Sequence, residues 1–214
     1  MKAKLLLTAA FALLFALPAF AQIAPLAPQC VRGTLASYIA LGAEGCTFDS
    51  VLYDNFTYAS PVLNAITPAE IVVTPILLPV AGLSPGLNFS APWSVAAGKS
   101  EISVIGFKAV PFPPNAADIL PLTGTLTLDL GLAKVSGIVG SVTVEEKTSV
   151  ASTAAPLEVY EICEDACTIK ERDSVTVSGI QILQTTITVS LSGGTGGASL
   201  ESFASDYAFG PQPE

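Results

Sequence analysis

The apolar residues of this chain recur at every second position in short runs, and this feature constrains its fold more than any other. In the clearest run, leucines alternate with polar residues: Leu126, Leu128, Leu130 and Leu132 face one way, and Thr125, Thr127 and Asp129 face the other. This period is typical of a strand with one buried face. Similar runs, separated by turns rich in Gly and Pro, recur from residue 51 to residue 209. We therefore predict an all-β fold, an antiparallel β-sandwich of about nine or ten strands.

Two prolines and the segment after the leucine run predict the position of three strands in the sheets. Pro75, within residues 70–78, indicates an edge strand or a bulged one, because proline cannot donate to the ladder. Pro92 interrupts the strand predicted at residues 87–95. Residues 135–144 should return antiparallel to the leucine run.

One segment has helical periodicity instead. Leu35, Tyr38 and Ile39 are spaced i, i+3 and i+4, Thr34 can cap the start of a helix and Gly42 can end it. A helix this short is marginal alone in water, so packing must hold it in place. The sequence predicts one short N-terminal helix across the open end of a sheet.

The cysteines predict two disulfides. Cys30, Cys46, Cys163 and Cys167 form an even set, as in proteins of oxidising compartments. Proximity favours Cys30–Cys46 and Cys163–Cys167, which would stabilise the fold by about 3 and about 2 kcal/mol in the loop-entropy model. A zinc site at Cys163 and Cys167 is the alternative, but no second ligand pair lies nearby and the chain has no histidine.

The first 21 residues have the pattern of a secretory signal peptide. Lys2 and Lys4 precede an apolar run, and residues 19–21 form an A-x-A cleavage site. No later stretch has the 18 or more apolar residues of a spanning helix, so we expect no membrane span in the mature chain. We predict a secreted protein, extracellular or periplasmic, with the following parts: signal peptide 1–21, tether 22–29, a single β-sandwich domain 30–209 and a tail 210–214.

Charge and composition exclude several classes of function. The chain carries 9 basic and 18 acidic residues, a net charge of −9, and loss of the leader lysines makes it more acidic still. Affinity for nucleic acid and anionic lipid depends on Lys and Arg, so nucleic acid is set aside as a partner. The absence of histidine excludes Ser-His-Asp and Cys-His catalysis and histidine metal sites. We expect no cofactor.

Two acidic pairs, Glu145 with Glu146 and Glu158 with Glu161, are candidates for glycosidase chemistry, which uses two carboxylates at one site. Residues at odd spacing on a regular strand point to opposite faces, so neither pair would share a site. We therefore predict that the protein is not an enzyme and keep a glycosidase-like activity as the third hypothesis.

Acidic residues also surround the hairpin that the Cys163–Cys167 bridge would close: Glu164, Asp165, Glu171 and Asp173. Carboxylate oxygens are the ligands that Ca²⁺ prefers, which makes these four weak calcium candidates. Lys170 and Arg172 are interleaved with them, and this favours cross-strand ion pairs instead. We expect no metal.

The aromatic residues predict more core than binding surface. Trp93 is the only tryptophan, and a single tryptophan in a sandwich usually belongs to the core. In the strand predicted at residues 51–58, Tyr53 lies opposite the apolar face, which holds Leu52, Phe56 and Tyr58 with Asp54 as its polar member. At most one of the two tyrosines can then belong to a flat surface that stacks on sugar.

Four short blocks and a turn at Gly98 occur in the same order as in a known family, and the blocks are residues 33–42, 45–46, 55–58 and 87–95. They resemble exported β-rich proteins of acidobacteria and related bacteria, whose members commonly carry a Pro-Glu-Pro sorting tail followed by a spanning helix and a basic end. The resemblance implies an exported β domain of unknown function and no catalytic residues. Residues 210–214, Gly-Pro-Gln-Pro-Glu, stop where the sorting motif would begin, so we expect free secretion.

Three functional hypotheses follow. The first is a non-enzymatic, exported component of the cell envelope, matrix or surface. The second is an extracellular carbohydrate-binding module, with or without assistance by calcium, and the third is the glycosidase. The sequence identifies no specific partner beyond a glycan or a matrix component.

Overall fold

The computed structural model describes residues 27–49, 51–62, 65–78, 84–111, 122–149, 156–180 and 182–210. The predicted signal peptide, most of the tether and residues 211–214 lie outside the described residues. Within the described part, 14 strands and one helix are formed. The prediction of an antiparallel sandwich is confirmed in its two-sheet architecture, but the count of nine or ten strands was wrong. Residues 135–144 contribute to two strands in different sheets, and the short strands Gly33–Thr34 and Cys46–Phe48 were not predicted.

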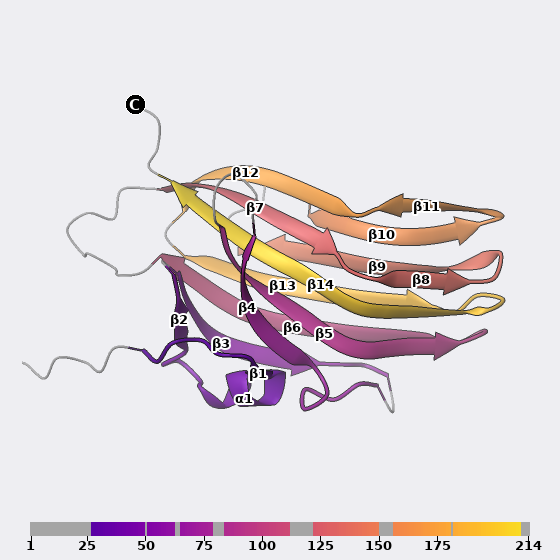
Figure 1. The fold of residues 1–214 in the computed structure, drawn as a ribbon, viewed down its shortest axis with the longest axis horizontal. Helices are drawn as coiled ribbons and strands as arrows, with labels where there is room; N and C mark the ends of the chain where they lie inside the picture. Colours follow the sequence, from indigo (N-terminus) through magenta and orange to yellow (C-terminus); the bar gives the residue numbers. More distant parts are fainter. Residues whose placement is uncertain are drawn as a thin grey trace, which may run out of the picture.

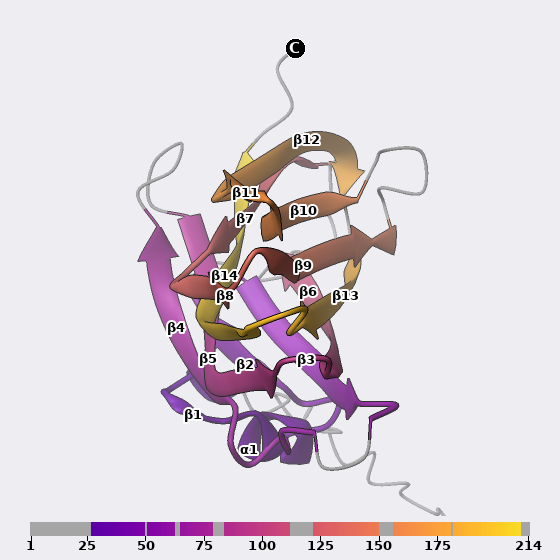
Figure 2. The same cartoon turned by 90° about the vertical axis from the view of Figure 1, so that its right-hand side faces the viewer.

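Two seven-stranded sheets face each other, as Figures 1 and 2 show. The β14 sheet contains, in spatial order, β1 (Gly33–Thr34), β4 (Val72–Leu78), β5 (Ser84–Ala96), β14 (Gly197–Gly210), β7 (Leu122–Leu130) and β12 (Arg172–Ile180), with β8 (Ala133–Ser136) also paired to β14. The β13 sheet contains β11 (Ala166–Lys170), β10 (Leu157–Glu164), β9 (Val139–Thr148), β13 (Leu183–Ser192), β6 (Ser100–Pro111), β3 (Val51–Ala59) and β2 (Cys46–Phe48). All of these strand pairs are antiparallel.

The core lies between the sheets and contains a row of aromatic rings. Phe107 of β6 contacts Phe89 of β5 at 6.0 Å between ring centroids, Phe89 contacts Phe203 at 5.1 Å, and Phe203 contacts Trp93 at 5.7 Å. Trp93 is fully buried, as predicted, and its indole N–H donates to Ser103 Oγ over 3.3 Å. Rings offset in this way add to the stability that burial alone gives.

Helix α1 (Leu35–Ala40) forms where the sequence predicts it. Thr34 caps it by accepting from the Ser37 N–H over 3.2 Å, and Gly42 follows the helix with a left-handed φ of 59°. Leu35 is buried, and its N–H donates to the Ile71 carbonyl over 2.8 Å. The helix therefore closes the opening between the edges of the two sheets, at the bottom of Figure 2.

Strand β3 departs from the predicted alternation. Tyr53 and Phe56 were expected on opposite faces, but both are buried in the core. The pairing with β6 shifts register between Asp54 and Thr57, and Asn55 takes a left-handed φ of 54° at this bulge. One extra residue turns the second half of a strand over, so the face assignment was wrong.

The leucine run and its predicted return strand also differ from expectation. Leu132 is 70% exposed because β7 ends at Leu130, and Thr127, predicted to face water, is buried. Residues 135–144 do not pair with β7: β8 pairs with β14, and β9 pairs with β10 and β13 in the other sheet. The turn at Gly137, with a φ of 112°, allows the chain to cross from one sheet to the other.

Pro75 and Pro92 lie at positions where the strand pairing does not require a backbone N–H donor. Strand β1 pairs only with Val72 and Val73, so Pro75 belongs to the part of β4 beyond it, as the edge prediction requires. Pro92 lies at the register shift between β5 and β14, so β5 continues through it as a bulged strand. Among the described helices, none is long and apolar enough to cross a membrane.

Candidate binding groove

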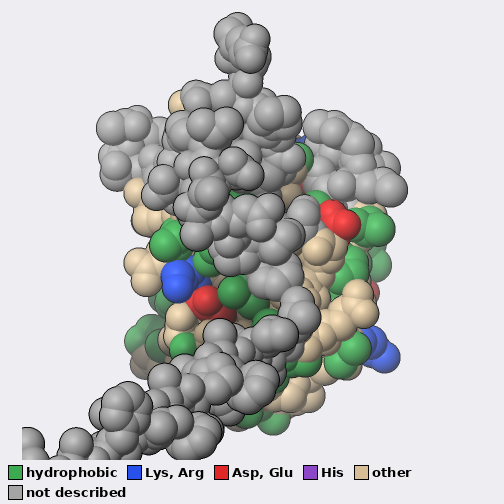
Figure 3. All heavy atoms as spheres, turned by 90° about the vertical axis from the view of Figure 1, so that its left-hand side faces the viewer, with side chains coloured by type: hydrophobic (Ala, Val, Ile, Leu, Met, Phe, Trp, Pro, Cys, Tyr) green, Lys and Arg blue, Asp and Glu red, His purple; other side chains and the backbone are tan. Residues whose placement is uncertain are grey.

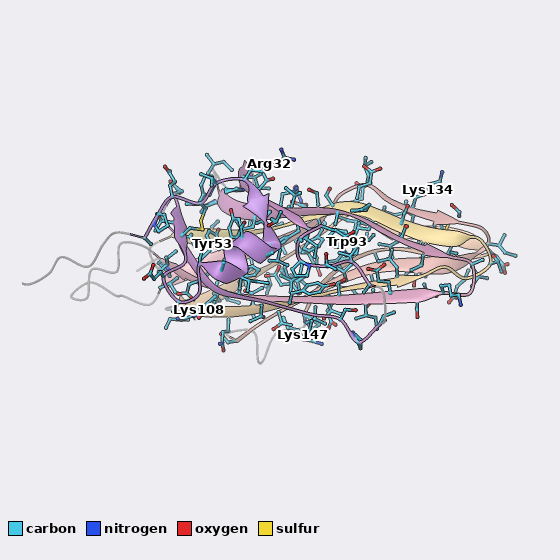
Figure 4. All side chains as sticks on the ribbon, turned by 90° about the horizontal axis from the view of Figure 1, so that it is seen from below. Arg32, Tyr53, Trp93, Lys108, Lys134 and Lys147 are labelled. Carbon is cyan, nitrogen blue, oxygen red and sulfur yellow. A yellow bond between two sulfur atoms is a disulfide. The ribbon has the colours of Figure 1, made fainter. Side chains whose placement is uncertain are left out.

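A groove of about 350 Å³ lies on the outer face of the β13 sheet. Its lining comes from three neighbouring strands: Asn55 and Thr57 of β3, Gly106, Phe107 and Lys108 of β6, and Gln184, Thr185 and Thr186 of β13. Figure 4 shows Lys108 and Lys147 on this outer face and Arg32 and Lys134 on the opposite one, with Tyr53 and Trp93 between the layers. The groove is therefore separate from the core.

Gly106 lies in the floor of the groove, where the absence of a side chain lets Thr57 approach closely. It is paired with Thr57 on one side and Thr186 on the other, in the middle of three adjacent strands. A Cβ at this position would lie 2.5 Å from Thr57 Oγ1. A glycine inside a strand weakens it, and such a residue often marks a place where a ligand or another backbone approaches closely.

The bulge in β3 forms one wall of the groove. The Asn55 N–H donates to the Gly42 carbonyl over 2.9 Å, and its side-chain Nδ2 donates to Asp54 Oδ1 over 2.6 Å. Asp54 is only 4% exposed and lies 3.6 Å from Lys108 Nζ. The carboxylate therefore holds both Asn55 and Lys108 in place and offsets the charge of the lysine.

The groove carries little net charge. Of the described residues that line it, only Lys108 is charged, and Asp54 is its partner. Figure 3, which views the end of the molecule where the β13 strand begins, shows few charged side chains among hydrophobic and other ones, and a basic and an acidic one lie next to each other there. The remaining polar groups of the lining are amides and hydroxyls.

A polar network lies behind the groove, between the sheets. Thr185 Oγ1 is 3.0 Å from the Tyr207 hydroxyl, which accepts from Ser205 Oγ over 3.0 Å and donates to Glu146 Oε1 over 3.4 Å. Burial raises the pKa of Glu146 to about 7, although hydrogen bonds from Ser205 and Tyr207 oppose the shift. The carboxyl is thus partly protonated near neutral pH and can share in the network as a donor.

Both predicted disulfides are confirmed. The Cα atoms of Cys30 and Cys46 are 4.9 Å apart, and those of Cys163 and Cys167, which close the β10–β11 hairpin, are 4.0 Å apart. Glu161, Cys163 and Cys167 are, among the described residues, the one set whose ligand atoms lie close enough to hold a metal. The two sulfurs are bonded to each other, so no thiolate is available to zinc there.

The structure does not bring the four calcium candidates together. Glu164 and Asp165 lie at the tip of the β10–β11 hairpin, whereas Glu171 and Asp173 follow the other end of β11. Asp173 accepts from Lys170 Nζ over 2.8 Å. Both basic residues form ion pairs, as expected, but only Arg172 does so across strands among the described residues, and its partner is Asp129 and not one of the four candidates.

The acidic pairs considered for catalysis are split as the strand geometry predicts. Glu146 faces the core, while Glu145 is on the outer face and pairs with Lys147 over 2.7 Å. Glu158 is exposed, and Glu161 accepts from the Val135 N–H over 3.1 Å. The sequence did not indicate that Glu146 accepts a buried hydrogen bond from Tyr207 between the two sheets.

Sequence reasoning missed the groove. Two signals were present: a glycine inside the alternating run that contains Phe107, and Asn55, a residue type that tolerates a left-handed φ. Neither signal indicates which strands become neighbours, and the groove requires three of them.

No protein family model matches this chain, and no curated protein matches it. Solved structures that were matched include the carbohydrate-binding module TmCBM61 in complex with β-1,4-galactotriose, with 12% identity, 73% of this chain and 88% of that chain covered, and a TM-score of 0.28. A second is the enzymatically active domain of tailspike protein 4 of bacteriophage CBA120, with 10% identity, 72% and 19% coverage and a TM-score of 0.30. A third is the family 11 carbohydrate-binding module of Clostridium thermocellum in complex with a β-1,3-1,4-mixed-linked tetrasaccharide, with 5% identity, 74% and 89% coverage and a TM-score of 0.18. TM-scores this low bear on neither the function nor the ligand of this chain.

Proposed function

We propose that this protein is an exported, non-enzymatic β-sandwich that acts by binding, and that the groove over Gly106 takes a short segment of a neutral glycan. The observation that carries the proposal is a hollow in an exposed sheet face, with a glycine of β6 in its floor and a lining mainly of amides and hydroxyls. Two disulfides are consistent with a protein that works outside the cytoplasm.

The lining suits a ligand rich in hydroxyl groups. Asn55 and Gln184 each offer a donor and an acceptor, and Thr57 and Thr186 offer hydroxyls that can do either. A sugar presents the same mixture of donors and acceptors around its ring. The groove volume of about 350 Å³ lies within the range of ligand sites, roughly 300–1,000 Å³.

The lining also indicates the strength of binding. Phe107 contributes to the groove but is only 3% exposed, so it offers no ring face for stacking. Recognition then depends on hydrogen bonds, which exchange with water at small net gain. We expect a Kd of roughly 0.1–1 mM for a short oligosaccharide.

A glycan array followed by calorimetry on the best hit tests the proposal. Thr186→Val removes a hydroxyl from the groove, and Gly106→Val places a side chain in its floor that must displace the Thr57 hydroxyl. Thr188→Val is the matched control, because Thr188 follows Thr186 on the same face of β13 but lies outside the lining. We expect about tenfold weaker binding for both groove variants and unchanged binding for the control, with each variant shown to be folded by its melting curve.

Two outcomes would contradict the proposal. The first is an array without hits at a protein concentration on the order of 1 mM. The second is a hit whose affinity is the same in Thr186→Val, Gly106→Val and the unmodified chain, since the glycan would then bind elsewhere.

A further inference from the structure

The two sheets end in edge strands, and an edge presents backbone N–H and C=O groups that can pair with another chain. The β13 sheet ends at β2 and at β11, and the β14 sheet ends at β12 and at β4 with the short β1. Proteins normally protect such edges with short strands, prolines or charged side chains, especially lysine. The four edges of this sandwich can be compared on that basis.

Three of the edges carry such protection in the part of the chain that the structure describes. Strand β2 has only 3 residues, and β4 has Pro75 just beyond the two residues that β1 covers. Strand β11 has 5 residues, is joined to β10 by the Cys163–Cys167 bridge and ends in Lys170. None of these three offers a long regular edge.

Strand β12 is different. It has 9 residues without proline, and within the described residues it pairs with β7 alone. Its charged residues are confined to its first two positions, Arg172 and Asp173, and Asp173 also accepts from the Glu158 N–H of β10 over 3.0 Å. Its register with β7 is regular from Arg172 to Val177, and a shift follows before Ile180. Figure 2 shows it at the border of the β14 sheet, with no labelled strand of that sheet beyond it.

The composition of this edge suits pairing with a copy of itself. Val175, Thr176 and Val177 are β-branched, and such residues are favoured in cross-strand pairs. Ser174 and Thr176 are exposed on the outer face, while Val175 is only partly buried and would be covered further by a neighbouring strand.

The net charge of −9 makes copies of this protein repel one another. Contact between copies is therefore favoured at an edge that has little charge of its own, and β12 is such an edge. Only Arg172 and Asp173 are charged in β12, and both are paired, with Asp129 and Lys170 respectively. In an antiparallel arrangement about a two-fold axis near Val175, Ser174 of one copy lies opposite Thr176 of the other. Like charges therefore do not face each other across the axis.

We propose that β12 is the site at which a second copy of this chain adds, strand β12 to strand β12 and antiparallel, to form a continuous sheet across a two-fold dimer. This inference is independent of the glycan groove, which lies on the other sheet. Pairing leaves both grooves open and presents two of them on one particle, which raises avidity for a repetitive polymer. A self-associating exported protein also fits the role of a matrix or surface component.

Sedimentation velocity of the mature chain over a range of concentrations tests the proposal. We expect a monomer–dimer equilibrium with a Kd on the order of 10 μM. Thr176→Lys places the usual edge-blocking side chain on β12 and should weaken the dimer at least tenfold. Thr168→Lys is the matched control, because Thr168 is an exposed threonine on β11, an edge strand of the β13 sheet. Its replacement should leave the dimer unchanged.

Hydrogen exchange gives a second readout that needs no variant. Amides of residues 172–177 should become more protected as the protein concentration rises, and those of residues 166–170 should not. A chain that stays monomeric at about 1 mM overturns the proposal, as does a dimer that survives Thr176→Lys or gains protection only at another edge.

Discussion

Tyr207 of β14 donates its hydroxyl proton to Glu146 Oε1 of β9 over 3.4 Å and so joins the two sheets through the interior of the sandwich. Glu146 is 2% exposed, and its second oxygen, Oε2, has no hydrogen-bond partner among the described residues. A carboxylate charge in this position lacks the water that would stabilise it. The protonation state of one side chain is therefore coupled to the contact between the sheets.

Stability should fall as the pH rises from about 4.5 to about 7. Burial first, and the nearby Asp206 charge, raise the pKa of Glu146 from 4.5 to about 7, against hydrogen bonds from Ser205 and Tyr207. The folded state then holds this proton more tightly than the unfolded chain does, so the unfolded state gains stability by releasing it across that interval. The loss is on the order of 3 kcal/mol from this residue and is complete above about pH 7, as urea unfolding at a series of pH values can show.

Glu146→Gln isolates this contribution. The amide keeps the size of the side chain and cannot ionise, so the variant should be more stable than the unmodified chain at pH 8 and should lose less stability between pH 4.5 and 7. Glu145→Gln is the control on the neighbouring exposed residue. Identical pH dependence in the Glu146→Gln variant and the unmodified chain would show that the carboxyl is not buried as described.

Two glycines near the groove should differ in their tolerance of alanine. Gly42 and Gly45 have nearly the same left-handed φ, 59° and 60°. Gly42 has open space around it, whereas a Cβ at Gly45 would lie 2.7 Å from the Asp54 Cβ, and closer still to the Tyr53 carbonyl oxygen. Gly42→Ala should cost about 1 kcal/mol for the backbone conformation alone, and Gly45→Ala clearly more, because β3 must move.

The same pair of variants also reports on the groove wall. Since Asp54 orders Asn55 and Lys108, Gly45→Ala should weaken binding at the groove as well as lower stability. Gly42→Ala should weaken binding less, because its only contact with the wall is the backbone hydrogen bond from the Asn55 N–H among the described contacts. Chemical unfolding and calorimetry measure the two effects. Equal losses of stability in both variants would mean that the space around Gly45 is not as tight as the structure has it.

The two disulfides should contribute unequally. Cys30–Cys46 spans 16 residues and encloses α1, whereas Cys163–Cys167 spans 4 and joins residues that are already paired in a hairpin. In the loop-entropy model, their removal costs about 3 and about 2 kcal/mol respectively. Urea unfolding of the two double Cys→Ala variants tests the order, and a larger loss from the Cys163–Cys167 variant would contradict it.

Local signals in the sequence were sufficient to predict the helix and the disulfides, whose contacts join residues close together in the chain. Thr34 and Gly42 bound a helix through contacts a few residues away, and cysteines 4 and 16 residues apart can meet with little help from the rest of the fold. Trp93 was placed in the core because a single tryptophan in a sandwich usually belongs there. These predictions required no knowledge of which strands become neighbours.

The predictions that failed depend on long-range pairing. The bulge at Asn55 exists because β3 must meet β6, about 50 residues later, in two registers at once. The crossing of the chain at Gly137 depends on β14 pairing with β8, and β14 comes last in the sequence. The groove depends on the bulge in β3 and on which strands become neighbours. An alternating pattern can indicate the strands but not their order in the sheet.

Calcium should have little effect on the stability of the folded chain. Asp173 is engaged by Lys170 and by the Glu158 N–H over 3.0 Å, and Glu164 and Asp165 lie at the far end of β11 from it, roughly 15 Å along a strand of 5 residues. Ca²⁺ needs six to eight oxygen ligands within one shell, and the described carboxylates do not assemble one. Melting curves in EDTA and in Ca²⁺ at about 10 mM should agree within about 1 °C, because a ligand stabilises a protein only as far as it binds the folded state. A rise of several degrees with Ca²⁺ and none with Mg²⁺ would contradict this expectation, and the loss of that rise in Asp165→Asn or Asp173→Asn would identify which end of β11 holds the ion.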